Sequence, residues 1–269
     1  MSEQPEEEKN LSFRVERYRD INNPSLWGSG FRLVQACNAL GQIKSISDRI
    51  MGDLRSIDWP WVRGVFDTSN NEDLAWEVPY DPAIVSDEDM RKASYVASEI
   101  LHYVRSSLDH LVYNVSWADR RSRQDDTQFP IFDSATSWTP RMIQRRLGGM
   151  SQHHAAWIES VQPFSGVEWT RILRDLSNAD KHRFNVKVSP TVQFDLDTGT
   201  IHPDPEDANR QRAAIKNVTL HFLLPEVDQH GGDIAKVFDA MFVGAGELIN
   251  KFLVEAGVTP IQITLPGQA

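Results

Sequence analysis

The stretch LHYVRSSLDHLVYNVSW, residues 101–117, decides the fold of this chain. At about 100° per residue, its apolar side chains gather on one face of a helix. That face consists of Leu101, Val104, Leu108, Leu111, Val112 and Val115. The opposite face mixes small, aromatic and histidine side chains, namely Tyr103, Ser106, Ser107, His110, Asn114 and Trp117. The pattern predicts a bundle helix that is covered on both faces, by a sheet, a second helix or a partner chain.

Helical and strand patterns follow one another in blocks along the rest of the chain. Ser86 and the acids after it predict the start of the helix, which runs from about residue 87 to 117. Apolar residues at helical spacing and local cap residues predict further helices in residues 29–54, 139–149, 152–163, 166–183 and 233–255. Period-two runs predict a hairpin near 61–80 and strands after residue 183.

These blocks predict an α+β protein, with a helical bundle, a β-hairpin insertion, a small antiparallel sheet and a C-terminal helix. The expected organisation is an acidic tail and lead-in at 1–24, a bundle at 25–183 with its hairpin near 61–80, antiparallel strands with a closing helix at 184–257, and a frayed tail at 258–269.

The charge of the chain restricts its partners. A net charge of -10 argues against a general nucleic-acid coat, which needs a basic surface. Between residues 141 and 187, however, eight Lys and Arg face four Asp and Glu. This local surplus either attracts a phosphate or an RNA strand, or is ordinary charge on exposed helices.

The cysteine count and the hydropathy pattern argue against disulfide-bonded, Cys-metal and membrane-spanning proteins. Cys37 is the one cysteine, so neither an intramolecular disulfide nor a Cys-based metal site is possible. No apolar run of about 18 residues occurs, so no membrane span is expected. No signal peptide is visible, and a cytoplasmic location is the expectation.

Arg105 and His110 are the polar residues of the deciding helix that invite a catalytic interpretation. Asp109 lies four residues after Arg105, so an ordinary i,i+4 ion pair is one explanation for the arginine. Five positions correspond to roughly 140° of rotation, so Arg105 and His110 do not share a face of one straight helix. If they act together, a second chain contributes or the helix breaks between them.

The segment RSSLDHLVY, residues 105–113, resembles the Arg-x4-His signature of HEPN domains, small helical bundles of bacterial toxin and anti-phage systems. Many members are dimeric, metal-independent ribonucleases with the active site at the dimer interface. The resemblance implies that Arg105 binds the scissile phosphate and that His110 is the acid–base for attack by the RNA 2′-hydroxyl. The chain departs from the pattern at Ser106, where the family often has Asn, Asp or His, and at Tyr113, which is displaced from the usual tyrosine position.

A longer region, roughly residues 90–185, resembles a family of uncharacterised bacterial proteins. Members share an LRSxLDHL helix, an FPI segment, a QP pair and a late LxNxDKHR. Here these read VRSSLDHL at 104–111, FPIF at 129–132, QPF at 162–164 and LSNADKHR at 176–183. This likeness implies no known activity.

The segment SNADKHR, residues 177–183, concentrates polar side chains at the end of a helix. One interpretation is a helix C-terminus whose cations suit the dipole. The other brings Asp180 and His182 into one pocket with Asp109 and His110, for acid–base chemistry or a metal. No spacing typical of metal ligands occurs, so neither a metal nor a cofactor is expected.

Three hypotheses follow. The first is a HEPN-like ribonuclease, a toxin or anti-phage effector that acts on RNA as a homodimer and has an antitoxin or other protein partner. Its candidate catalytic residues are Arg105, His110, Asp109 and His182, and its candidate substrate-binding residues are Lys181, Arg183, Asn178 and Tyr113. The second is a non-catalytic binding or oligomerisation module. The third is a small-molecule or metal-dependent enzyme that uses the Asp109, His110, Asp180 and His182 group.

Overall fold

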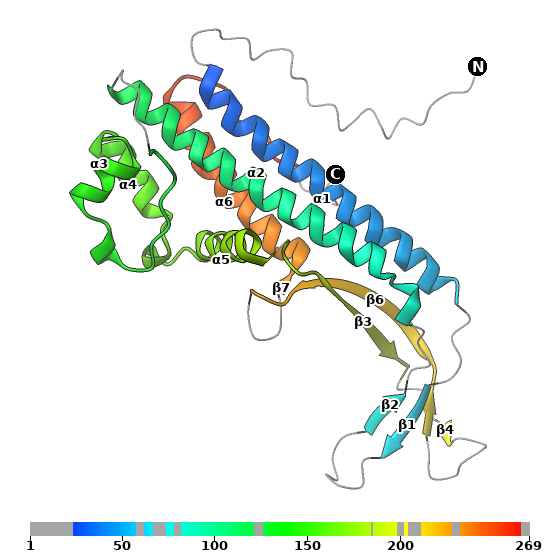
Figure 1. The fold of residues 1–269 in the computed structure, drawn as a ribbon. Helices are drawn as coiled ribbons and strands as arrows, with labels where there is room; N and C mark the ends of the chain where they lie inside the picture. Colours follow the sequence, from blue (N-terminus) through cyan, green and yellow to red (C-terminus); the bar gives the residue numbers. More distant parts are fainter. Residues whose placement is uncertain are drawn as a thin grey trace, which may run out of the picture.

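The fold is taken from a computed structural model. It describes residues 24–57, 62–66, 74–77, 82–120, 126–183, 185–197, 202–203, 211–227 and 232–264. The expected acidic tail, up to residue 23, lies outside these ranges. The predicted α+β class is confirmed, with long helices, short antiparallel sheets and a C-terminal helix (Figure 1).

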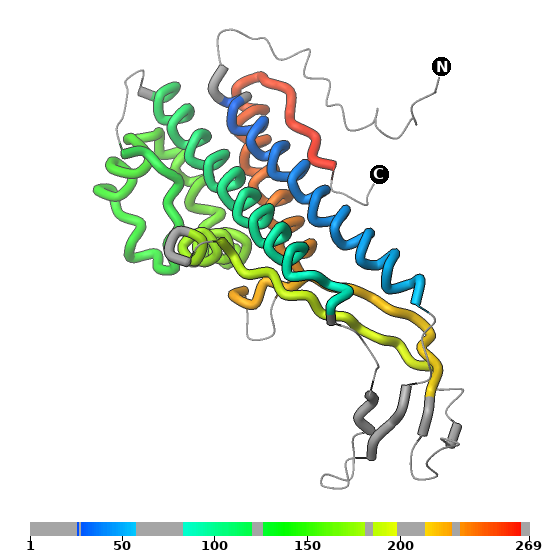
Figure 2. Tube along the Cα trace, turned by 45° about the vertical axis from the view of Figure 1, so that its right-hand side comes forward, coloured from blue at the N-terminus to red at the C-terminus, as the bar shows by residue number. Residues whose placement is uncertain are grey.

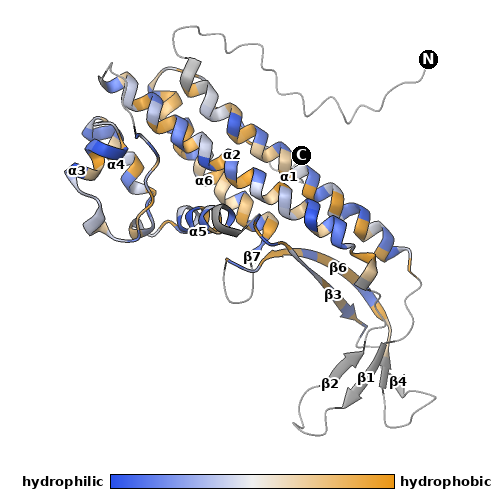
Figure 3. Cartoon of the chain, in the orientation of Figure 1, coloured by the Kyte–Doolittle hydropathy of each residue, from blue (hydrophilic) through white to orange (hydrophobic). Residues whose placement is uncertain are grey.

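Three long helices form the centre of the protein. They are α1 (Pro24–Arg55), α2 (Asp87–Arg120) and α6 (Ile234–Glu255). Figure 1 shows α1 and α2 side by side with α6 behind them. α2 begins as predicted, because Ser86 Oγ accepts the backbone N–H of Asp89 and donates to the carboxylate of the same residue at 2.6 Å. α6 is the most hydrophobic of the three (Figure 3), and half of its 22 residues are buried.

Shorter helices flank one side of this centre. They are α3 (Pro140–Arg146), α4 (Gln152–Ser160) and α5 (Glu168–Arg183), with 3-10 turns η3 (Pro82–Ile84), η4 (Ala135–Ser137) and η5 (Pro163–Ser165). Thr139 caps α3 and Pro140 occupies its first position, as the sequence predicts. Ser151 caps α4 through the backbone N–H of His154.

Two antiparallel sheets complete the fold. One has the order β2-β1-β5-β4, with strands Leu74–Glu77, Val62–Phe66, Gln211–Ala213 and His202–Pro203. The other has the order β3-β6-β7, with strands Ser189–Leu196, Ile215–Leu224 and Gly232–Asp233. β1 and β2 pair as the expected hairpin, but β1 also pairs with β5, so the hairpin is part of a larger sheet.

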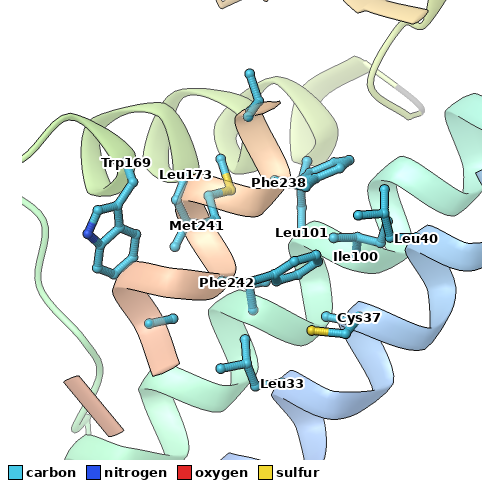
Figure 4. Packing of buried hydrophobic residues seen from close by; sticks show 14 of the residues in the cluster. Leu33, Cys37, Leu40, Ile100, Leu101, Trp169, Leu173, Phe238, Met241 and Phe242 are labelled. Carbon is cyan, nitrogen blue, oxygen red and sulfur yellow. The ribbon is translucent and has the colours of Figure 1, made fainter. Parts of the chain in front are cut away.

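One continuous core joins the bundle to the last helix. Figure 4 shows side chains from four helices in contact, among them Leu33, Cys37, Leu40, Ile100, Leu101, Trp169, Leu173, Phe238, Met241 and Phe242. α6 therefore contributes to the same core as α1, α2 and α5. The buried side chains of this core come from both before and after residue 183, because the strands return the chain to the bundle.

The chain after α6 is held in place up to residue 264. The side chain of Asn250 donates to the carbonyl of Ile261 at 2.9 Å and accepts its backbone N–H at 2.7 Å. Figure 2 shows this last segment running back beside α1. A Cβ on Gly30 would meet Ile261 at 2.9 Å, so the glycine allows the close approach. A frayed tail was expected at 258–269, and its residues 265–269 lie outside the described residues.

The described helices were compared with what a membrane-spanning helix requires. None of the described helices combines the length and the apolar character that crossing a bilayer requires.

Candidate functional site

Arg105 and Asp109 hold the backbone of Phe129 from one face of α2. Arg105 Nη2 donates to the carbonyl of Phe129 at 2.5 Å, and Asp109 Oδ1 accepts the backbone N–H of Phe129 at 2.8 Å. The two side chains also form the predicted i,i+4 ion pair, at 3.3 Å. Phe129 is fully buried, so these bonds satisfy both of its main-chain polar groups away from water.

Gln162 holds the following residues of the same segment from the opposite side. Its amide nitrogen donates to the carbonyls of Pro130 at 2.9 Å and Ile158 at 3.0 Å. Its carbonyl oxygen accepts the backbone N–H of Phe132 at 3.0 Å. Gln162 is completely buried, and with all these bonds made its amide is well satisfied.

Three sequence motifs therefore meet in one lock, defined here as Arg105, Asp109 and Gln162 with the backbone of residues 129–132. The lock ties α2, the extended segment and the end of α4 together over separations of 20 to 32 residues. The motifs that resemble the uncharacterised family thus have a structural reason to occur together. The Phe129 carbonyl and Asp109 occupy Nη2 of Arg105, so a phosphate would compete with them for this nitrogen.

His110 lies away from the lock. It is exposed on α2, about 100° around the helix from Asp109. Burial and the positive charge of Arg32 on α1 lower the pKa of His110, although Asp109 opposes the shift. The imidazole is therefore neutral at pH 7 and could accept a proton. The structure places Arg105 and His110 on different faces of α2, and this agrees with the helical geometry.

Tyr113 shares the face of His110. The two residues are three positions apart, and Trp117 follows four positions later, so all three lie along one line of α2. Tyr113 is 39% exposed and Trp117 is 46% exposed, and Phe31 of α1 is 40% exposed. We call Phe31, His110, Tyr113 and Trp117 the outer face.

The SNADKHR segment closes α5 on the other side of α2. Just after α5, the backbone N–H groups of Val186 and Val188 donate to the hydroxyls of Ser98 and Ser94. These serines lie within about 20° of Arg105 around α2, and about 120–160° from His110. The path of α5 therefore does not favour a common pocket with His110.

The individual residues of that segment are only partly visible. Asn178 is exposed and Asp180 is partly buried. The backbone of Lys181, His182 and Arg183 belongs to α5, but their side chains lie outside the described residues. Whether these side chains act in catalysis or in substrate binding stays a prediction.

His154 forms a partly buried bridge between α2 and α6 that the sequence did not reveal. Its Nδ1 lies 2.8 Å from Asp119 Oδ2 on α2, and its Nε2 lies 2.8 Å from Glu255 Oε2 on α6. Burial alone would lower the pKa of His154, but the hydrogen bonds to Asp119 and Glu255 outweigh it and raise the pKa. The ring also packs on Trp157 and Phe252.

The basic surplus of residues 141–187 is partly neutralised within the fold. Arg171 pairs with Glu168 and Asp175. Arg174 pairs with Asp175 at 2.7 Å and with Asp133, which lies 41 residues earlier, at 2.5 Å. Glu168 and Asp175 are already included in the sequence count, so only the pair with Asp133 lowers the positive surplus of residues 141–187 further.

Other titratable groups were also missed by sequence reasoning. His221 lies 3.0 Å from Asp233, and both line a pocket with Lys44 and Asp239. No local spacing signals this group, because its members come from β6, β7, α6 and α1. Within the ranges that the structure describes, no cluster of His, Cys, Asp and Glu has the arrangement of a metal site.

Comparison with known proteins gives no relative from which a role could be transferred. No protein-family model matches the chain, no curated protein matches it, and no solved structure matches the fold. The HEPN resemblance therefore depends on the residues of the sequence alone.

Proposed function

We propose that this protein is a helical module that associates with a second copy of itself through the outer face. The observation that carries the proposal is the lock. Because Arg105 and Asp109 are both bound to Phe129, the most distinctive part of RSSLDHL has a structural role. His110, Tyr113 and Trp117 are left on the opposite, exposed side.

The composition of the outer face supports this partner. Between residues 106 and 117 the only acidic residue is Asp109, and its carboxylate is turned to Phe129. In a chain with a net charge of -10, a surface without acids is where two copies meet with least repulsion. Aromatic side chains are also typical of the centres of protein interfaces.

The amphipathic pattern of α2 points the same way. The sequence predicts cover on both faces of this helix, and among the described residues the second cover is incomplete at Tyr113 and Trp117. A two-fold contact between two copies would cover Tyr113 and Trp117 without a different protein, because each copy presents the same patch. Dimers are also what the HEPN resemblance implies.

The test is sedimentation velocity of the wild type, Trp117→Ser and Tyr95→Ser over a wide concentration range. Tyr95 is the matched control, since it is an exposed aromatic on α2 about 33 Å along the helix from Trp117. We expect a dimer that Trp117→Ser weakens at least tenfold and Tyr95→Ser leaves unchanged. A wild type that stays monomeric at about 100 µM, or equal weakening by both variants, would contradict the proposal.

A metal-independent ribonuclease is the second candidate, and the state of His110 favours it. An exposed imidazole that is neutral at pH 7 can take the proton of an RNA 2′-hydroxyl as it attacks the scissile phosphate. A dimer through the outer face would bring a second His110 near the site, and its imidazolium form would protonate the leaving 5′-oxygen. Arg32 is then the better phosphate ligand, because Arg105 is bound to Phe129.

Cleavage of a labelled mixed RNA pool in EDTA tests this candidate, with His110→Ala, His182→Ala and Arg32→Gln beside the wild type. Loss of cleavage in His110→Ala supports it, and the His182→Ala result shows whether the end of α5 takes part. Absence of cleavage by a folded wild-type dimer at high concentration rejects the ribonuclease and leaves the binding module intact.

A further inference from the structure

A pocket of about 150 Å³ opens between α1, β6 and the start of α6. Apolar side chains from α1 and β6 form part of its wall, and Lys44, His221, Asp233 and Asp239 contribute its charged groups. Its size suits a small metabolite, since pockets for drug-sized ligands are about 300–1,000 Å³. It lies apart from the lock and from the outer face.

Asp233 fixes the histidine of this pocket. One oxygen of Asp233 caps α6 by accepting the backbone N–H groups of Ala235 and Lys236, at 3.0 and 3.2 Å. The other oxygen lies 3.0 Å from Nδ1 of His221. A carboxylate at this nitrogen holds the proton on Nδ1 and orients the ring. Among the described residues Nε2 of His221 has no hydrogen-bond partner, so it is left for a ligand.

Asp239 and Lys44 are two opposite charges that do not pair with each other. Asp239 is partly buried, and within the described chain its carboxylate makes no hydrogen bond or ion pair. Burial, and then the negative charge of Asp233, raise the pKa of Asp239, so a cation beside it would be favourable. Lys44 is exposed at the pocket wall and forms no ion pair with a described carboxylate.

We propose that this pocket binds a small zwitterion that carries an ammonium group and a carboxylate, such as a short amino acid. The ammonium group binds Asp239, next to Asp233. The carboxylate binds Lys44, and Nε2 of His221 supplies or accepts a further hydrogen bond. Both unpaired charges of the pocket are then neutralised by one ligand, which neither a simple amine nor a simple acid achieves.

The experiment follows the imidazole signals of His221 by NMR in the full-length protein at neutral pH. The probes are glycine, β-alanine and 4-aminobutyrate, with n-propylamine and propionate as single-charge controls. Asp239→Asn and Lys44→Met remove one binding charge each without changing the shape much. Lys92→Met, on the exposed surface of α2, is the matched control.

We expect at least one zwitterion to shift His221 with saturation, and to bind at least tenfold more weakly to Asp239→Asn and to Lys44→Met. Lys92→Met should bind like the wild type. The proposal is overturned if no zwitterion shifts His221 at 50 mM, if propionate or propylamine binds as tightly as the best zwitterion, or if both pocket variants, shown to be folded, retain wild-type affinity.

Discussion

Asp109 Oδ1 accepts the backbone N–H of Phe129 at 2.8 Å, across 20 residues of chain. The carbonyl of the same Phe129 is held by Arg105, one turn earlier on α2. The i,i+4 ion pair predicted from the sequence thus also satisfies a buried peptide, and this explains why the two charges lie one turn apart. Their separation matches the two polar groups of one residue.

Asp109→Ala should lower the free energy of unfolding by about 1–3 kcal/mol, because it leaves a buried N–H without an acceptor. Denaturant unfolding at neutral pH measures the change. The control is Arg91→Ala, which removes an exposed ion pair to Glu88 and should cost less than about 0.5 kcal/mol. Equal effects of the two substitutions would mean that the bond to Phe129 contributes nothing.

Gln162→Met should destabilise the protein by about 2–3 kcal/mol, since it keeps the side-chain volume but leaves the bonds to Pro130 and Phe132 unmade. Hydrogen exchange should rise first in residues 129–132. Gln152→Met, at the exposed start of α4, should leave both quantities unchanged. Unaltered hydrogen exchange in Gln162→Met would show that Gln162 does not hold residues 129–132.

His154 should make stability depend on pH. Its pKa in the folded protein is raised above the ordinary value of about 6.5, so its contribution is complete below pH 6.5. That contribution is lost as the pH rises through the folded pKa. Unfolding measured from pH 5.5 to 9 should show this decline in the wild type and a flatter profile in His154→Gln.

His153→Gln provides the comparison, because His153 is exposed and, among the described residues, has Glu255 as its one ion-pair partner, at 3.5 Å. This variant should retain the wild-type decline with pH. An NMR titration that places the pKa of His154 below 6.5 would show that burial dominates over its two carboxylates.

Gly244→Ala should destabilise by about 1–3 kcal/mol, because a Cβ there would collide with the indole of Trp169. The fluorescence of the protein should change as this indole is displaced. Gly52→Ala is the opposite case, since nothing lies within 4 Å of its Cβ and alanine favours helix. This substitution should stabilise the protein by about 0.5–1 kcal/mol. If both variants lower the free energy of unfolding, the collision with Trp169 does not explain the effect at Gly244.

Cys37 should resist alkylation in the folded protein. Burial and the negative charge of Asp239 raise the pKa of its thiol to about 12, so very little thiolate exists at pH 8. Iodoacetamide followed by mass spectrometry should show labelling only after denaturation. Rapid labelling of the native protein would indicate that the core around Cys37 opens.

Much of the fold could be predicted from local pattern. The apolar period of 3.6 residues located α1, α2 and α6 to within a few residues, and Thr139 with Pro140 located the start of α3. These signals can be read from the sequence because the residues that interact lie only three or four positions apart in the chain. The fold class follows from them, as does the ion pair between Arg105 and Asp109.

The candidate sites depended on contacts that no local pattern contains. Asp109 meets Phe129, Gln162 meets Pro130, and His154 meets Glu255 101 residues away. Such pairs are chosen by how buried backbone and charge are satisfied once the elements have packed.

The sequence by itself determined the helices, their caps and the two-faced character of α2. Only the tertiary structure decided which face of α2 took the extended segment and which was left with His110 and Trp117. The physical reason is that helical periodicity depends on nearest turns, whereas the position of residues 129–132 depends on buried peptide groups that need partners from distant segments.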